Sequence, residues 1–253
     1  MAALLDDLIA QVIALEIRLR ACIERLVAHT DDEALHDLRV ATRRLRSLLH
    51  PLRGLAAVDV LDQAAADLAR LSSPLRDLEV LITELRSQRL ERLVPDRERA
   101  LRSGYAQFLL APELTRLLLV LEAWPHLIRV CDREGLVTGL RKKSEKFLGK
   151  SLRQVGQALR APAHDRHRLR LLIKRLRYGL DAYPNLVELS PRTRQLLVGA
   201  QTALGIWHDH VQWLARAENE PDLRPRVRAW QVAMHAAEVR SDRVLEKLLR
   251  RLR

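Results

Sequence analysis

Apolar residues recur three and four positions apart along most of this chain of 253 residues. Successive residues of an α-helix turn by about 100°, so this spacing gathers them on one helix face. The first such segment runs from about Leu4 to Ala28 and carries Leu8, Val12, Leu15, Leu19, Ile23 and Leu26. The chain also has only nine glycines and ten prolines. The pattern therefore predicts an all-α protein.

Turn-forming residues divide the rest of the chain into further predicted helices. The segment Leu204–Asp209 is interpreted as a turn, and it aligns with Ser72–Asp77, where Ser72-Ser73-Pro74 caps the start of a helix. A less patterned region from about residue 96 to 133 holds one or two helices broken at Pro112 and Pro125. The other predicted helices cover about residues 58–71, 74–94, 135–160, 191–204, 206–218 and 225–251.

One helical sequence of eleven residues occurs twice, at residues 36–46 and again at 167–177. Six of the eleven positions are identical, and Arg43 is matched by Lys174, which keeps the charge. Neither copy contains glycine or proline, so each is predicted to be helical. Candidate N-caps precede both copies: Thr30, Asp31 and Asp32 before the first, and Asp165 before the second.

Each copy places its cations on the side opposite its leucines. In the first copy, one arc of about 80° collects His36, Arg39, Arg43, Arg46 and His50. In the second copy, the same positions hold His167, Arg170, Lys174 and Arg177. We call these sets the first and second stripes. Two rows of cations at one spacing indicate a surface for binding an anion.

The order of a helix, a striped helix, a further helix and a helix bearing an aspartate occurs twice, about 131 residues apart. An amphipathic helix cannot bury its apolar face alone, so each half is predicted to be a four-helix bundle. We expect one domain over residues 1–253, with repeat one at about 1–125 and repeat two at about 126–253. The two bundles would be pseudo-symmetric, and the stripes would face a shared basic cleft between them.

Charge strengthens this interpretation. The formal net charge is +12, so a polyanionic partner is expected. There are 38 arginines against six lysines, and the planar guanidinium binds phosphate in a bidentate way. Four of the lysines lie in the helix predicted at 135–160, where one face carries Lys142, Lys146, Lys150, Arg153 and Arg160.

These features resemble those of the CHAD domain, the conserved-histidine α-helical domain. The resemblance lies in the basic helix that begins with a histidine, the Arg76-Asp77 turn, and the duplication of both. It covers the chain from about Leu4 to Leu249. Family membership implies two pseudo-symmetric four-helix bundles and a positively charged channel that binds inorganic polyphosphate. Members are implicated as polyphosphate-granule or polyphosphate-linked proteins, some of them fused to a triphosphate-processing CYTH domain.

Carried over residue by residue, the resemblance implies that both basic helices bind polyphosphate, through His36, Arg39, Arg43, Arg44 and Arg46, and through His167, Arg170, Lys174, Arg175 and Arg177. His50 and the cations Lys142, Lys146, Lys150 and Arg153 complete the predicted site. The chain departs from the family pattern at His208, where an arginine would match Arg76, and at Glu79, which replaces the more usual aspartate. The Glu-x-Glu-x-Lys motif of a CYTH module has no counterpart.

Alternatives exist for each of these residues. A basic helix face is often a solvated surface, but neither stripe has acidic residues four positions after its cations except Asp181, so local pairing is sparse. His36 and His167 could be structural histidines. Neighbouring cations disfavour the charging of either one, and a neutral imidazole can still donate a hydrogen bond to phosphate. Asp77 and Asp209 are expected to fix arginines by ion pairs.

The sequence indicates no catalytic site. His164 and His167, and His208 and His210, are the nearest approach to metal-ligand spacing, but no carboxylate completes either pair. Gly149-Lys150-Ser151 resembles the end of a P-loop, but Ser144 occupies the position of the first glycine. No nucleophile-elbow motif is present. We therefore expect a binding protein without enzymatic activity, cofactor or metal.

The predicted ligand is inorganic polyphosphate, with other polyanions as possible partners and nonspecific nucleic-acid binding as the alternative function. Aromatic residues make up only 4% of the chain, which leaves few platforms for base stacking. Two isolated cysteines, no basic leader and no apolar segment of about 18–20 residues predict a cytoplasmic protein without a membrane span. Association with polyphosphate granules is expected from the resemblance.

Overall fold

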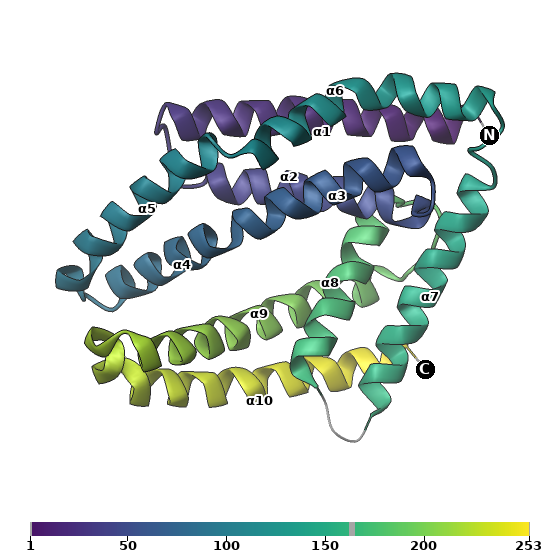
Figure 1. Cartoon of the computed structure of the whole chain (residues 1–253). Helices are drawn as coiled ribbons and strands as arrows, with labels where there is room; N and C mark the ends of the chain where they lie inside the picture. Colours follow the sequence, from purple (N-terminus) through teal and green to yellow (C-terminus); the bar gives the residue numbers. More distant parts are fainter. Residues whose placement is uncertain (1, 162–164, 253) are drawn as a thin grey trace. The chain divides into compact units, whose positions relative to one another are not determined.

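The structure, a computed structural model, describes residues 2–161 and 165–252. Within these residues it contains helices and no strand, which confirms the all-α prediction (Figure 1). The chain forms two compact units, Met1–Ser144 and Glu145–Arg253, which are described separately below. The boundary falls within α7 (Leu140–Arg160).

Four helices of the first unit pack in a closed ring. These are α1 (Ala2–Val27), α2 (Ala34–Leu49), α3 (Ala56–Leu71) and α6 (Pro112–Arg133). Helix α1 contacts α2 and α6, and α3 contacts the same two helices (Figure 1). Their leucines fill the interior, where Trp124 is fully buried and its Nε1 donates to the carbonyl of Ala57 over 3.1 Å.

Two more helices extend the first unit as a hairpin. Helix α4 (Ser73–Ser87) follows α3 directly, and α5 (Val94–Leu109) packs against α4. Short 3-10 helices, η1 (His50–Leu52) and η2 (Glu91–Leu93), follow α2 and α4. The junction of α3 and α4 is Ser72, which is fully buried, so a tight joint lies beside the striped helix α2.

The second unit contains most of α7, then α8 (Arg166–Ala182), α9 (Pro191–Asn219), η3 (Pro221–Arg226) and α10 (Val227–Arg251). Helix α9 contacts both α8 and α10 (Figure 1). Helix α7 approaches α8 at Gly179, where an added Cβ atom would lie 2.9 Å from Leu148 Cδ2 and 3.2 Å from Phe147 Cε1. The missing side chain at Gly179 therefore lets these two helices pack closely.

The predicted breaks at Pro125 and Gly205 are wrong. Pro125 lies inside α6, where buried residues on both sides, including Leu121 and Ile128, keep the helix continuous. Gly205 lies inside α9, which runs unbroken for 29 residues, so Leu204–Asp209 is not a turn. A glycine in a helix costs only about 1 kcal/mol relative to alanine, and the buried face of α9 offsets that cost.

Two helix starts also differ from the prediction. Helix α7 begins at Leu140 rather than Gly135, because Gly135 and Gly139 adopt φ angles of 70° and 63°. The N-cap of α2 is Glu33 without a side-chain cap, and Asp31 Oδ1 accepts from the Glu33 amide over 3.0 Å instead. The predicted cap of α8 is confirmed, since Asp165 accepts from the Arg168 amide over 2.9 Å.

In the described part of the chain, no helix by itself has the length and apolar character needed to cross a membrane. The segments Glu91–Leu109 and Pro112–Arg133, bent by 44° relative to each other, meet those criteria only as a pair.

Candidate anion-binding site

Both striped helices bury their leucines and leave their cations on the opposite side. In α2, the residues between Ala34 and Leu49 that are fully covered are apolar apart from Thr42. All five residues of the first stripe, from His36 to His50, are half-buried. Arg44 lies about 100° further round the helix and is exposed. Arg44 therefore lies apart from the first stripe, although the resemblance includes it among the residues of this helix that bind polyphosphate.

The second copy repeats this arrangement within its own unit. Arg170, Lys174 and Arg177 are half-buried, and Arg175, the counterpart of Arg44, is exposed. The stripe is one residue shorter, because Asp181 occupies the position of His50 and pairs with Arg177 over 3.2 Å. His167 is exposed, whereas its counterpart His36 is half-buried, so the two stripes share their three central cations and differ at both ends.

Arg39 is held by three hydrogen bonds from within the first unit. Its Nη1 donates to the Ala69 carbonyl over 3.0 Å and to Ser72 Oγ over 2.7 Å, and its Nη2 donates to Ser73 Oγ over 3.2 Å. Burial, together with the charge of neighbouring Arg43, lowers the pKa of this guanidinium. Arg39 therefore braces the joint between α3 and α4 in addition to any role at the surface.

Arg46 also has a partner that the sequence did not reveal. Its Nε lies 3.2 Å from Asp62 Oδ1, and Arg53 Nη2 lies 2.6 Å from Asp62 Oδ2. Asp62 is buried in α3 at a position that reads as part of an apolar helix face. One carboxylate between two guanidiniums leaves a surplus of positive charge at this end of the first stripe.

His36 lies at the other end of the first stripe. Burial lowers its pKa, and the charges of Arg76 and Arg43 act in the same direction, against Glu33 and Asp37. The imidazole is therefore neutral at pH 7 and can donate one hydrogen bond.

Arg76 is a residue of this surface that the predicted site omitted. It lies on α4 and pairs with the buried carboxylate of Glu79 over 2.8 Å. Tyr105 of α5 donates to the same carboxylate, and burial and this bond raise the pKa of the Tyr105 phenol. The aligned Arg-Asp turn in the sequence was the available signal for Arg76. Asp77, expected to form an ion pair with a stripe arginine, lies close enough to Arg39 to oppose the lowering of its pKa.

His208 occupies the matching position in the second unit. Its ring on α9 lies 5.6 Å from the ring of His167, centroid to centroid. Burial is the largest cause that lowers the pKa of His208 to about 4, followed by the charges of Arg170, His167 and Lys174. His208 thus joins the second stripe from a neighbouring helix, as Arg76 joins the first.

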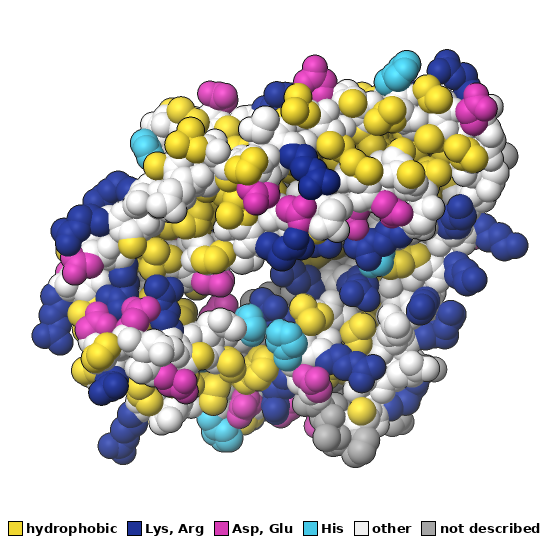
Figure 2. Space-filling view, viewed as in Figure 1, with side chains coloured by type: hydrophobic (Ala, Val, Ile, Leu, Met, Phe, Trp, Pro, Cys, Tyr) yellow, Lys and Arg dark blue, Asp and Glu magenta, His cyan; other side chains and the backbone are white. Residues whose placement is uncertain are grey.

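The cations predicted on α7 are exposed along that helix. Lys142, Lys146, Lys150 and Arg153 all stand in solvent, and Figure 2 shows Lys and Arg side chains gathered over α7. These side chains are exposed, whereas the arginines and the lysine of the two stripes are half-buried.

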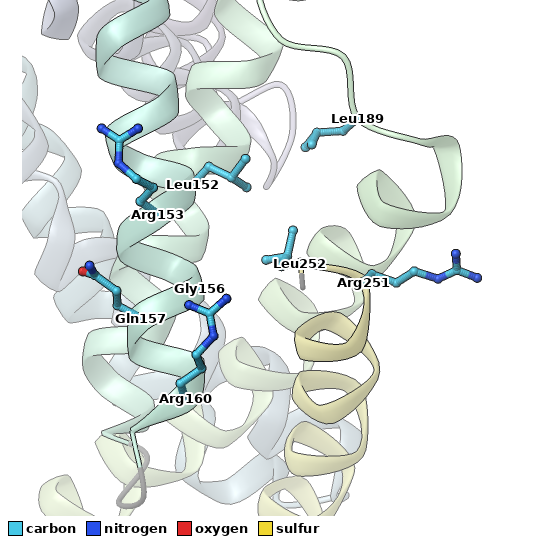
Figure 3. Close-up of a pocket in the computed structure, with 8 residues that line it drawn as sticks. All are labelled: Leu152, Arg153, Gly156, Gln157, Arg160, Leu189, Arg251 and Leu252. Atoms are coloured by element: carbon cyan, nitrogen blue, oxygen red, sulfur yellow. The ribbon is translucent and has the colours of Figure 1, made fainter.

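Arg153 also lines a cavity of about 460 Å³ within the second unit. Figure 3 shows the cavity between α7 and the end of α10: Leu152, Leu189 and Leu252 point into it, whereas the guanidiniums of Arg153 and Arg251 extend outward. Arg160 stands at the α7 wall. The cavity has an apolar floor, and its described lining residues do not include those of the second stripe.

Metal binding has little support from the described residues. Across residues 2–161 and 165–252, no three His, Cys, Asp or Glu side chains lie close enough together to hold a metal ion. His164, considered above with His167, lies outside the described residues.

The described residues form only helices, and each of the two units contains a basic helix that carries a histidine near its start. These features are those of a CHAD domain. A sequence model of the CHAD domain matches residues 14–218, and the chain belongs to the CHAD domain family.

The fold comparison agrees with this assignment. The crystal structure of the CHAD domain from the plant Ricinus communis is similar to this chain with a TM-score of 0.72 and 24% sequence identity. The similarity covers 98% of this chain and 91% of that one, and it shows a shared fold. The comparison with curated proteins found no match.

Proposed function

We propose that this CHAD domain protein binds inorganic polyphosphate through the two stripes, without chemical turnover. The observation that carries the proposal is the repetition, in each unit, of half-buried cations on the side of the helix opposite its leucines. Membership of the family, which implies polyphosphate binding, supports the same ligand. We further propose a cytoplasmic location in association with polyphosphate granules.

The geometry of a stripe suits a linear polyanion. Residues four positions apart on a helix recur about every 5.4–6 Å along its axis, so each turn offers one cation to a run of phosphates. Contacts with phosphate oxygens supply affinity that does not depend on base sequence. Half-burial also limits the motion of the long side chains, which reduces the entropy lost when an anion binds.

Competition at fixed salt tests the ligand. Long-chain polyphosphate should displace a labelled polyphosphate probe at lower phosphate concentration than duplex DNA or RNA does. Equal displacement by the nucleic acids would favour a nonspecific polyanion binder. Preferential displacement by RNA or DNA would overturn the proposal in favour of nucleic-acid binding.

Paired substitutions test the stripes. Arg43→Gln with Lys174→Gln removes one cation from each stripe, and Arg102→Gln with Arg240→Gln removes one exposed cation from each unit elsewhere. By analogy with nucleic acids, each lost phosphate contact should flatten the log–log salt dependence by about 0.7–0.9. The stripe pair should therefore flatten it by roughly 1.4–1.8, and the control pair should change it little.

Both pairs lower the net charge by two, so net charge cannot explain a difference between them. The leucines hold the helices in place, and both variants should melt near the native temperature. Equal loss of affinity in the two pairs would show that overall charge, and not the stripes, determines binding.

A further inference from the structure

His208 lies on α9 beside the second stripe, and the site predicted from the sequence does not include it. Its ring faces His167 of α8 at 5.6 Å and lies 6.4 Å from the ring of Trp207. Its Nδ1 is buried and has no hydrogen-bond partner among the described residues. The imidazole of His208, which can both donate and accept hydrogen bonds, therefore lies beside the second stripe with one ring nitrogen unpaired.

The charged groups around His208 are mainly cations. Helix α8 presents Arg170, Lys174 and His167 to it, and all three disfavour its charging. On α9 itself Asp209 is the next residue. From α10, Glu238 accepts from the neighbouring Trp207 Nε1 over 3.3 Å and lies 3.4 Å from His235. No carboxylate of the described chain is among the groups that perturb the pKa of His208.

The matching position in the first unit is built differently. Arg76, the counterpart of His208, carries a permanent charge, and the buried Glu79 three residues later neutralises it over 2.8 Å. The residue that aligns with Glu79 in the second copy is Val211. The carboxylate is thus present where the cation is permanent, and it is absent where the side chain can become neutral.

We propose that His208 is a phosphate ligand of the second unit, and that it takes up a proton when an anion binds to the second stripe. This inference rests on the proposed polyphosphate binding. In the unliganded unit burial, and after it the charge of the neighbouring cations, keeps the imidazole neutral. A bound phosphate offsets those cations and accepts a hydrogen bond from the ring, so the charged form becomes favourable. The bound phosphate thus neutralises protonated His208 in the second unit, as Glu79 neutralises Arg76 in the first.

The consequence is a pH dependence of anion binding at the second unit. His208 has a pKa of about 4 in the unliganded protein. If the anion returns it to about 6–6.5, the ordinary value for histidine, the affinity should rise roughly 10- to 30-fold between pH 7.5 and pH 5.0. Long polyphosphate chains suit this measurement, since their internal phosphates stay ionised over the whole range.

The test compares the native protein with His208→Gln and His208→Arg by calorimetric titration with long-chain polyphosphate at both pH values. Glutamine keeps a hydrogen-bonding side chain that does not titrate, and arginine supplies a permanent charge. We expect the pH-dependent gain to shrink by the stated factor in His208→Gln. His208→Arg should bind more tightly than the native protein at pH 7.5, by about the same factor. Titration in two buffers of different ionisation enthalpy should show fewer protons taken up by His208→Gln than by the native protein.

The other histidines remain in both variants, so the difference between proteins isolates His208. If polyphosphate binds and the native protein and His208→Gln gain equally on acidification, the role of His208 is overturned and the proposed function stands. If no variant binds at either pH, both fail. Melting at pH 7.5 identifies a variant that does not fold, and the proton count of the remaining variant then decides.

Discussion

A substitution of Arg39 can distinguish a structural role of this residue from a role in binding polyphosphate. Replacing it with methionine keeps a long apolar stem and removes three hydrogen bonds to the end of α3 and to Ser72 and Ser73. If Arg39 braces the joint between α3 and α4, Arg39→Met should destabilise the first unit. Arg44→Met is the matched control, because Arg44 is exposed on the same helix and no hydrogen bond or ion pair of its side chain occurs among the described residues.

The loss of stability in Arg39→Met depends on which polar groups lose their hydrogen-bond partners. Hydrogen bonds to charged groups contribute about 1.5–3 kcal/mol each, so three bonds set a high ceiling. The loss is smaller than that ceiling, because both serine hydroxyls also donate to the Ala69 carbonyl, over 3.3 Å from Ser72 and 3.0 Å from Ser73, and so keep that acceptor satisfied. Arg39 is half-buried, and its replacement also removes the free-energy cost of partly desolvating the guanidinium in the folded protein. This gain offsets part of the loss. We expect a loss of about 2–3 kcal/mol in the free energy of unfolding.

Urea unfolding and thermal melting measure this loss directly. At about 2–4 °C per kcal/mol for a domain of this size, the melting temperature should fall by roughly 4–12 °C. Arg44→Met should stay within about 0.5 kcal/mol of the native protein. A native-like melting temperature for Arg39→Met, combined with a loss of polyphosphate affinity as large as that of Arg43→Gln, would refute the brace and make Arg39 a ligand only.

Three further predictions address packing, pH and turnover. Gly205→Ala should stabilise α9 by about 0.5–1 kcal/mol, because nothing lies within 4 Å of the added Cβ, whereas Gly179→Ala should destabilise, because the Cβ would lie 2.9 Å from Leu148; equal shifts in urea midpoint would contradict the close packing of α7 on α8. The depressed pKa of His208 means that the unfolded chain binds its proton first, so stability should fall as the pH drops from about 6.5 to about 4, and His208→Gln should lose part of that fall in melting curves recorded without ligand. Purified protein should release no orthophosphate from polyphosphate or nucleoside triphosphates, with or without magnesium or manganese; release that disappears in His36→Ala would identify a catalytic histidine.

The sequence predicted the helices well where leucines recur without interruption. Helix α2 and its stripe were placed correctly, because a buried leucine face fixes the opposite face. Two predicted breaks, at Pro125 and Gly205, were wrong because burial of the surrounding helix overrode the local preference for a break. The local sequence does not show how deeply a helix will be buried by its neighbours, so it could not predict that these two helices continue.

Much the same limit applies to the candidate site. The stripes follow from helical spacing, but their partners come from other helices. Nothing in the spacing of α2 connects Arg39 with Ser72 or Arg46 with Asp62. Glu79 and Tyr105 meet only because α4 packs on α5. These contacts depend on how the helices pack against one another, which helical spacing within one segment does not determine.

The helix that follows each stripe has a different form in the two copies. In the first copy this helix is divided into α3 and α4, with Pro74 opening the second part, and in the second copy α9 is continuous and carries Ile206 at the aligned position. Proline lacks the amide hydrogen that a continuous helix would use there, and Ser72 and Ser73 are likewise replaced in the second copy, by Leu204 and Gly205. The first unit therefore has a buried polar joint beside its stripe, and the second unit has an uninterrupted helix of 29 residues beside its own. A ligand that contacts both stripes meets two different supports, one held by side-chain hydrogen bonds and one by a continuous backbone.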